Sequence, residues 1–217
     1  MLVKDIMTTN VISASSNTLV MEARKIMEFH RIERLPIVDR GKLLGILTKD
    51  TLLKAGPSEA TSLSVWELNY LLAKMTVKEI MKKNVVTVTS DITVECAIAT
   101  AQSNKVGSLV VLDGDKVVGI LTTNDFFYQI LNPLMGIGGT GTRIIVYGAD
   151  EAKQIQNVMQ CINKNWVGIK AVCTLKSSQA EGKNDLVLHL DTEDTSEIIT
   201  QLKDIGFSVG IRIYHPC

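Results

Sequence analysis

The sequence has no excess of charge of either sign, because 23 lysines and arginines balance 23 aspartates and glutamates. A balanced chain carries no single-sign field that attracts nucleic acid or an acidic membrane, so we expect neither as a partner. Long apolar runs are also missing, since no stretch approaches the roughly 18 residues of a membrane helix. Because Lys4 and Asp5 interrupt the start of the chain before a signal peptide can form, we expect a cytoplasmic protein.

Catalytic and metal-binding signatures are equally scarce. The four cysteines stand far apart without a C-x-x-C pair, and no serine or cysteine lies in a nucleophile motif. His189 and Cys173 lie on stretches expected to form neighbouring strands, but two ligands alone do not make a metal site. We therefore predict that the protein is not an enzyme and has no catalytic residue, no metal and no obligatory cofactor.

What the sequence does contain is an internal repeat. Residues 3–51 lie over residues 77–125 without a gap, at an offset of 74 positions. The agreement includes residues 45–48 and 119–122, which both read GILT. A chain of 217 residues has room for this duplicated unit and for a second domain.

Each copy is predicted to fold as strand, helix, strand, strand and helix. In the second copy, residues 85–89 are β-branched as in a strand, and Ser90 or Asp91 is placed to cap the helix that follows. Two apolar strands then flank a turn at residues 114–115, which matches residues 40–41 of the first copy. A further helix follows the GILT stretch in both copies.

A turn-rich connector and a helix are predicted between the copies. Ser64 and Glu67 form a capping box, and apolar residues at helical spacing extend the predicted helix to Met75. In one interpretation this helix packs on its own module, and in the other it also lines a contact between subunits.

The glycine-rich stretch GIGGTG at residues 136–141 matches the dinucleotide-binding pattern G-x-G-x-x-G. That pattern must follow a strand and open a helix, whereas here a helix is predicted before it and a strand after it. We therefore interpret residues 132–141 as a flexible linker. Residues 142–217 predict the order βαββαβ, which indicates a ferredoxin-like sheet, so the predicted fold class is α/β (α+β).

The two copies resemble a pair of CBS domains, the arrangement called a Bateman module, because each has G-h-h-T-x-x-D or a near relative after h-P-h-V-D. The connector at residues 57–77 is similar to that of the bacterial acetoin-utilisation protein B family, and residues 142–217 resemble an ACT domain. The resemblance divides the duplicated part into a first CBS domain, residues 1–62, and a second with its leading helix, residues 63–131. It implies a homodimer and an adenosyl ligand such as AMP, ADP, ATP or S-adenosylmethionine.

The second GILT stretch supplies the best candidate for nucleotide contact. A Thr122 hydroxyl at a strand-to-helix turn suits a phosphate oxygen, and an Asp125 carboxylate can accept hydrogen bonds from both ribose hydroxyls. The alternative is that T-x-x-D only caps a helix. In the first copy Thr48 is retained, but Thr51 replaces the aspartate. Asp50 stands one position earlier, about 100° away on a helix, and is expected to cap its own helix.

Further candidates come from strand and helix ends near these turns. Backbone groups for adenine are expected at Ile12, Ser13, Val86 and Thr87, and cations for phosphate at Arg31, Arg34 and Lys105. For each cation the alternative is a solvated helix end.

The predicted function is a regulatory, signal-transducing protein that senses adenine nucleotides and relays their binding through the ACT-like domain. One alternative is an oligomerisation or adaptor protein with vestigial sites, and another is amino-acid sensing by the ACT-like domain. The first turn of that domain, YGADEA, keeps Asp150 but lacks the Pro-Gly pair usual in ligand-binding ACT loops.

Overall fold

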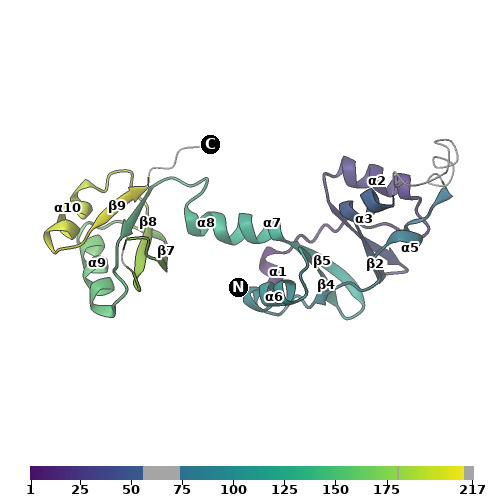
Figure 1. Cartoon of the computed structure of the whole chain (residues 1–217), viewed down its shortest axis with the longest axis horizontal. Helices are drawn as coiled ribbons and strands as arrows, with labels where there is room; N and C mark the ends of the chain where they lie inside the picture. The colour runs from purple at the N-terminus through teal and green to yellow at the C-terminus, as the bar shows by residue number, and fades with distance from the viewer. Residues whose placement is uncertain (56–73, 180, 213–217) are drawn as a thin grey trace. The chain divides into compact units, whose positions relative to one another are not determined.

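The computed structural model describes residues 1–55, 74–179 and 181–212. These residues form a mixed α and β fold that divides into two compact units, Met1–Asp125 and Phe126–Cys217 (Figure 1). Each unit has its own sheet, of five and four strands. The helix predicted to start at Ser64 falls largely on residues 56–73, outside the described residues, so that prediction stays a prediction.

The first unit contains both repeats in one sheet with the strand order β1-β2-β5-β4-β3. The elements of the first repeat are α1 (Val3–Ile6), α2 (Val20–Phe29), β1 (Arg34–Asp39), β2 (Lys42–Thr48) and α3 (Lys49–Lys54). Those of the second are α5 (Val77–Ile80), β3 (Thr87–Val88), α6 (Val94–Ser103), β4 (Ser108–Asp113), β5 (Lys116–Thr122) and α7 (Thr123–Phe126).

The predicted hairpins of both repeats are confirmed. Strands β1 and β2 pair antiparallel around Arg40 and Gly41, which both have positive φ and match the right-handed twist of the strands. Strands β4 and β5 pair around Gly114 and Asp115 in the same register. The two hairpins meet where Lys42 of β2 pairs with Lys116 of β5.

The start of α6 differs from the prediction. Thr93 caps the helix, because its hydroxyl accepts a hydrogen bond of 3.3 Å from the Cys96 N–H. Ser90 instead donates to the Asp113 carboxylate at 2.9 Å, and Asp91 accepts from a threonine hydroxyl upstream. The prediction that Ser90 or Asp91 caps this helix was therefore wrong, since both side chains are used before the helix begins.

The first strand of each repeat is also shorter than predicted. In the second repeat it is the two-residue β3, and in the first it is a single parallel bridge between Ala14 and Ile37. A short first strand is sufficient here, because the neighbouring hairpin supplies most of the sheet.

The repeats exchange their N-terminal segments. Leu2 and Thr8, on either side of α1, form bridges to Thr93 and Ile120 of the second repeat. At the positions related by the repeat offset, residues 76 and 82 on either side of α5 form bridges to residues 19 and 46 of the first repeat. Each repeat therefore completes its fold with a segment that belongs, in sequence, to the other one.

The exchanged segments are part of the hydrophobic core. Val77 of α5 is fully buried in the core of the first repeat, against residues from α2, β1 and β2. The other buried members of this cluster are Ala14, Ala23, Met27, Leu35, Ile37 and Leu47. Burial of apolar surface thus holds each segment on the opposite repeat.

The second unit has the predicted order βαββαβ. Its elements are β6 (Thr142–Val146), α9 (Ala152–Lys164), β7 (Ile169–Lys176), β8 (Asn184–Leu190), α10 (Ser196–Asp204) and β9 (Val209–Arg212). The sheet has the order β7-β8-β6-β9 with every pair antiparallel, which is the ferredoxin-like arrangement. Helices α9 and α10 pack on one face, where alternate residues of β6 and β8 form the core (Figure 1).

The chain enters the second unit through helical turns. The π-helix η1 (Phe127–Leu131) follows α7, and α8 (Asn132–Met135) ends at Gly136, which adopts the left-handed conformation with φ 70°. The first four residues of the predicted linker, residues 132–135, are therefore helical. The expected order around GIGGTG is confirmed, with a helix before it and strand β6 after it.

Candidate functional site

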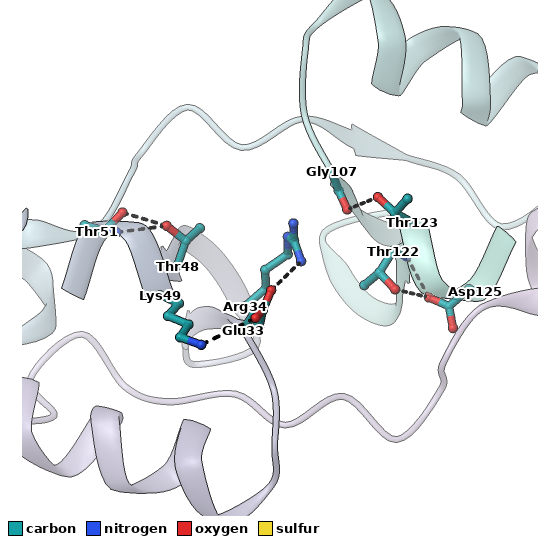
Figure 2. Close-up of polar contacts among 9 residues, drawn as sticks. All are labelled: Glu33, Arg34, Thr48, Lys49, Thr51, Gly107, Thr122, Thr123 and Asp125. Atoms are coloured by element: carbon teal, nitrogen blue, oxygen red, sulfur yellow. Dashed lines mark hydrogen bonds and ion pairs between the residues drawn. The ribbon is translucent and has the colours of Figure 1, made fainter. Parts of the chain in front are cut away.

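The candidate site is built on two turns, each of which joins a GILT strand to a short helix. At the β2–α3 turn, the Thr48 hydroxyl accepts a hydrogen bond of 3.2 Å from the Thr51 N–H and lies 2.8 Å from the Thr51 hydroxyl. At the β5–α7 turn, the N–H and the hydroxyl of Thr122 both donate to Oδ2 of Asp125 at 2.7 Å. Figure 2 shows that a hydroxyl closes one turn and a carboxylate closes the other.

The second oxygen of Asp125 has its own donor. The Thr8 hydroxyl, carried by the exchanged N-terminal segment, donates to Oδ1 of Asp125 at 3.3 Å. The half-buried Asp125 carboxylate thus caps its turn, as the alternative interpretation of T-x-x-D expects. It also accepts a hydrogen bond from a hydroxyl of the other repeat. Its contact with ribose stays a prediction.

Asp50 does not cap its helix. Its carboxylate forms an ion pair of 2.9 Å with Lys54, one turn further along α3, and the N-cap of that helix is Thr48. The prediction for Asp50 was wrong because a residue inside the first turn points along the helix surface, where the residue four positions later is its neighbour.

Arg34 is the predicted cation that the structure brings beside the Asp125 turn. Its side chain leaves β1, and a Cβ added to Gly107 would lie 2.7 Å from Nη2 of Arg34 and 3.4 Å from the Thr123 hydroxyl. That Thr123 hydroxyl donates to the Gly107 carbonyl at 3.2 Å, as Figure 2 shows. The Glu33 carboxylate lies 4.0 Å from the Arg34 guanidinium, which is beyond hydrogen-bond distance. Among the described residues, the donors of this guanidinium therefore stay available to a ligand.

The other two predicted cations occupy matching helix ends. Arg31 follows α2 and Lys105 follows α6, both with φ 53°, exposed, and without an ion pair among the described residues. Arg31 lines a cavity of about 480 Å³ between α2 and α3, whose apolar wall includes Met27 and Leu52. A role in phosphate contact stays a prediction for both residues, and the structure groups Arg31 with this cavity.

The residues proposed for adenine lie at the short first strands. Thr87 pairs with Val110 in β3, and the Val86 carbonyl accepts a hydrogen bond of 3.3 Å from the Val110 N–H. Ile12 and Ser13 precede the single bridge of the first repeat, and Ile12 packs against the core there. Their contact with adenine stays a prediction.

Two contributors to the Asp125 turn were not predicted from the sequence. Thr8 was missed because the repeat offset aligns it with Lys82, so the duplication marks no match at this position. Gly107 was missed because its counterpart is Glu33, and an isolated glycine before a strand carries little information. For Thr8, the sequence does offer one signal: the two copies differ at this position directly after two residues that match.

Candidate metal ligands are sparse in the part of the chain that the structure describes. His189 and Cys173 lie on the neighbouring strands β8 and β7, as predicted, opposite Ala171 and Val187. No group of three or more histidine, cysteine or acidic side chains there is placed to hold a metal. Within the same described ranges, every helix is too short or too polar to cross a membrane.

Comparison with known protein families finds one match for each repeat. The CBS domain family matches residues 3–58 and 77–132. A Vibrio cholerae protein assigned to acetoin utilization (AcuB) has a similar structure, with a TM-score of 0.53 and 29% identity, covering 62% of this chain and 93% of that one. The CBS domain pair of protein MJ0100, in complex with 5-methylthioadenosine and S-adenosyl-L-methionine, has a TM-score of 0.51 and 36% identity, covering 61% and 97%.

Two of the curated relatives are longer proteins that share part of their length with this chain. The L-aspartate semialdehyde sulfurtransferase of Methanocaldococcus jannaschii is 41% identical over 128 residues, which are 57% of this chain and 22% of that protein. The chain likewise spans 42% of the inosine-5'-monophosphate dehydrogenase of Korarchaeum cryptofilum.

Proposed function

The chain belongs to the CBS-domain family, and from this premise we propose that its duplicated unit is a regulatory module that binds an adenosyl ligand. The observation that carries the proposal is the environment of Asp125. Its two oxygens accept hydrogen bonds from the hydroxyls of Thr122 and Thr8. A carboxylate that accepts from two hydroxyls can exchange them for the two hydroxyls of a ribose.

The ligand class follows from the same residue and from the relatives. Protein MJ0100 is 36% identical over its CBS pair, and its two ligands share an adenosyl group and carry no phosphate. The ribose contact at Asp125 would serve those ligands and AMP, ADP or ATP alike. A nucleotide would add phosphate contacts, and the nearness of the Arg34 guanidinium to Gly107 supports a role for Arg34 in them.

The proposed role is regulation in the cytoplasm rather than catalysis. The sulfurtransferase relative shares only 22% of its length with this chain. We therefore assign the shared part to ligand sensing, and the chemistry of that longer protein to the rest of its length.

The second unit is proposed to be an ACT-like relay or partner-contact domain. Its first turn is hydrogen-bonded to strand β8, because the Asp150 carboxylate accepts a hydrogen bond of 2.9 Å from the Asn184 N–H. The Gly148 N–H in the same turn donates to the Asp185 carboxylate at 2.9 Å. Both contacts support a structural role for this turn over amino-acid sensing.

Thermal unfolding and calorimetric titration test the proposal. The ligands are AMP, ADP, ATP, S-adenosylmethionine, 5-methylthioadenosine and a panel of amino acids. A ligand that binds only the folded protein stabilises it by about 2.7 kcal/mol at a hundredfold excess over its Kd. We expect that shift with at least one adenosyl compound. We also expect the concentration of that compound to stay constant during prolonged incubation with the protein. Unshifted unfolding with all five adenosyl compounds contradicts the proposal, and a shift with an amino acid alone favours the alternative.

A further inference from the structure

The cavity between α2 and α3 is a candidate site that the adenosyl proposal does not use. Its volume of about 480 Å³ lies within the range of small-molecule pockets, roughly 300–1,000 Å³. The residues that line it come from the segments 20–33 and 49–55. Thr122 and Asp125 are not among them, so the cavity is separate from the turn proposed to hold ribose.

The wall of this cavity is largely apolar. Val20 and Met27, seven positions apart on one face of α2, are 5% and 4% exposed and belong to the wall. Leu52 of α3 and Ile32, which follows the end of α2, pack against the core of the first repeat and also line the cavity. A hydrocarbon chain that enters the cavity is therefore removed from water, which raises affinity by about fourfold for each buried methylene.

The charged side chains of the lining leave one cation without an ion pair. Glu28 is paired with Arg24 at 2.8 Å, and Glu33 is paired with Lys49 at 3.7 Å. Arg31 also lines the cavity and has no ion pair in the part of the chain that the structure describes. A negatively charged ligand thus finds a free guanidinium, whereas a positively charged ligand finds both carboxylates already paired.

Arg31 is held at the end of α2 by a motif that usually contains glycine. The Arg31 N–H donates to the Glu28 carbonyl at 3.2 Å, and the Ile32 N–H donates to the Met27 carbonyl at 2.9 Å. This pair of hydrogen bonds is the Schellman motif, whose left-handed residue is most often glycine. Arg31 occupies that position with φ 53°, a conformation that is uncommon for a residue with a Cβ. The motif therefore fixes the Arg31 backbone beside the cavity.

The second repeat has a cation in the same motif, which provides a matched control. The Lys105 N–H donates to the Gln102 carbonyl at 3.1 Å, and Lys105 also has φ 53°. A cation near the end of a helix interacts favourably with the helix dipole, and this explains a basic residue at both positions. Lys105 does not line the α2–α3 cavity, however. A contribution to binding in that cavity should therefore be specific to Arg31.

We propose that the α2–α3 cavity binds a small organic acid with a hydrocarbon chain. The chain lies along the apolar wall, and the carboxylate forms an ion pair with Arg31. Because Arg31 is exposed, the carboxylate stays in contact with water and avoids the cost of burying a charge. The site does not depend on an adenosyl ligand, so either proposal can fail without the other.

Calorimetric titration of the full chain with three probes tests the choice of ligand. Octanoate, 1-octanol and octyltrimethylammonium share an eight-carbon chain and differ in the charge of the head group. We expect octanoate to saturate at one equivalent per chain and to bind more tightly than the other two. Hexanoate, which is two methylenes shorter, should bind up to about fifteenfold more weakly than octanoate.

Arg31→Gln tests the ion pair, because it removes the charge and leaves the apolar wall in place. The affinity for octanoate should fall about five- to tenfold, between the loss of an exposed ion pair and that of a hydrogen bond to a charged group. The affinity of the same variant for 1-octanol should stay at the wild-type value, which also shows that the cavity is intact. Lys105→Gln, at the matching helix end, should bind octanoate as the wild type does.

Three outcomes overturn the proposal. Octanoate and octyltrimethylammonium could bind equally well, or Lys105→Gln could lose as much octanoate affinity as Arg31→Gln. The third outcome is that octanoate shows no saturable binding at all. If light scattering then gives twice the mass of one chain, the cavity belongs to a contact between two copies instead.

Discussion

Thr8 and Asp125 are 117 positions apart in the chain, and the hydroxyl of the first donates a 3.3 Å hydrogen bond to the carboxylate of the second. The repeat offset places Lys82 where Thr8 stands and Thr51 where Asp125 stands. The β5–α7 turn therefore has a carboxylate, from Asp125, beside a hydroxyl, from Thr8. At the β2–α3 turn the corresponding residues are a threonine and a lysine. Although the sequence is duplicated, the two turns offer different chemistry to a ligand.

Replacement of Asp125 by alanine should weaken adenosyl binding. Hydrogen bonds to a charged group are worth roughly 1.5–3 kcal/mol, which corresponds to about a ten- to hundredfold loss of affinity. The variant should also lose about 1 kcal/mol of stability, because the carboxylate caps its turn. Calorimetric titration and denaturant unfolding measure the two effects separately.

Asp50→Ala is the matched control for that variant, since it removes an aspartate from the corresponding helix of the first repeat. Its carboxylate is paired with Lys54, so affinity should stay at the wild-type value. Equal affinity of Asp125→Ala and wild type would leave Asp125 with the capping role alone.

Thr51→Asp should give the first repeat the acceptor that it lacks. The new carboxylate would stand in the first turn of α3, where the Thr48 hydroxyl already lies 2.8 Å from the side chain of residue 51 and could donate to it as the Thr122 hydroxyl donates to Asp125. We expect a second equivalent of ligand, or a higher affinity, in calorimetric titration. An isotherm that superposes on the wild-type one would mean that the first repeat lacks more than this carboxylate.

The two GILT glycines should respond differently to alanine. A Cβ on Gly45 would lie 2.8 Å from the backbone carbonyl of Lys82, whereas the three atoms nearest to one on Gly119 all belong to the flexible side chain of Met7. Overpacking that the backbone cannot relieve costs about 1–3 kcal/mol. Denaturant unfolding should therefore show the larger loss for Gly45→Ala, and equal losses would contradict the close approach at Lys82.

Ser16→Ala should reduce the acid sensitivity of the fold. Hydrogen bonds from the Ser16 hydroxyl, which has the larger effect, and from the Ser16 N–H hold the pKa of Asp39 below the ordinary value of 3.8. A depressed pKa in the folded state contributes stability above the unfolded pKa that is lost as pH falls through the acid range. The loss of stability between pH 7 and pH 3 should thus be smaller in the variant. Parallel pH profiles for variant and wild type would contradict this.

The homodimer expected from the sequence should depend on the α2–α3 face. Phe29 is 83% exposed and Leu53 is 73% exposed, and both lie on the two helices that border the 480 Å³ cavity. Light scattering should give twice the mass of one chain, and Phe29→Ser should lower that mass. Trp166→Ser, at a residue of the second unit that is 93% exposed, should leave it unchanged. A wild-type mass of one chain contradicts the dimer.

The sequence predicted what local periodicity and duplication determine. The hairpins around residues 40–41 and 114–115 and the order βαββαβ were predicted because apolar alternation and turn residues lie close together in the chain. The N-caps of α3 and α6 are Thr48 and Thr93, but the sequence analysis assigned them to other residues. Several polar side chains near each helix start can accept a hydrogen bond from the same N–H group, so the sequence alone does not decide between them.

Contacts between distant segments were not predictable in this way. The Thr8 hydroxyl reaches Asp125 only after the repeats have exchanged segments, and no periodicity records that exchange. Similarly, the glycines of residues 136–141 read as a flexible linker, because their close approach to His189 and Leu190 depends on the sheet that forms afterwards.

The exchanged segments make the tandem a covalent form of a domain-swapped pair. A chain with one copy of the repeat would leave positions 19 and 46 without the segment that pairs with them here, and would have to borrow it from a second molecule. Joining the copies in one chain replaces that encounter by an intramolecular one at high effective concentration. The first 55 residues and residues 74–126, produced as separate polypeptides, should therefore fold by complementing each other and not alone.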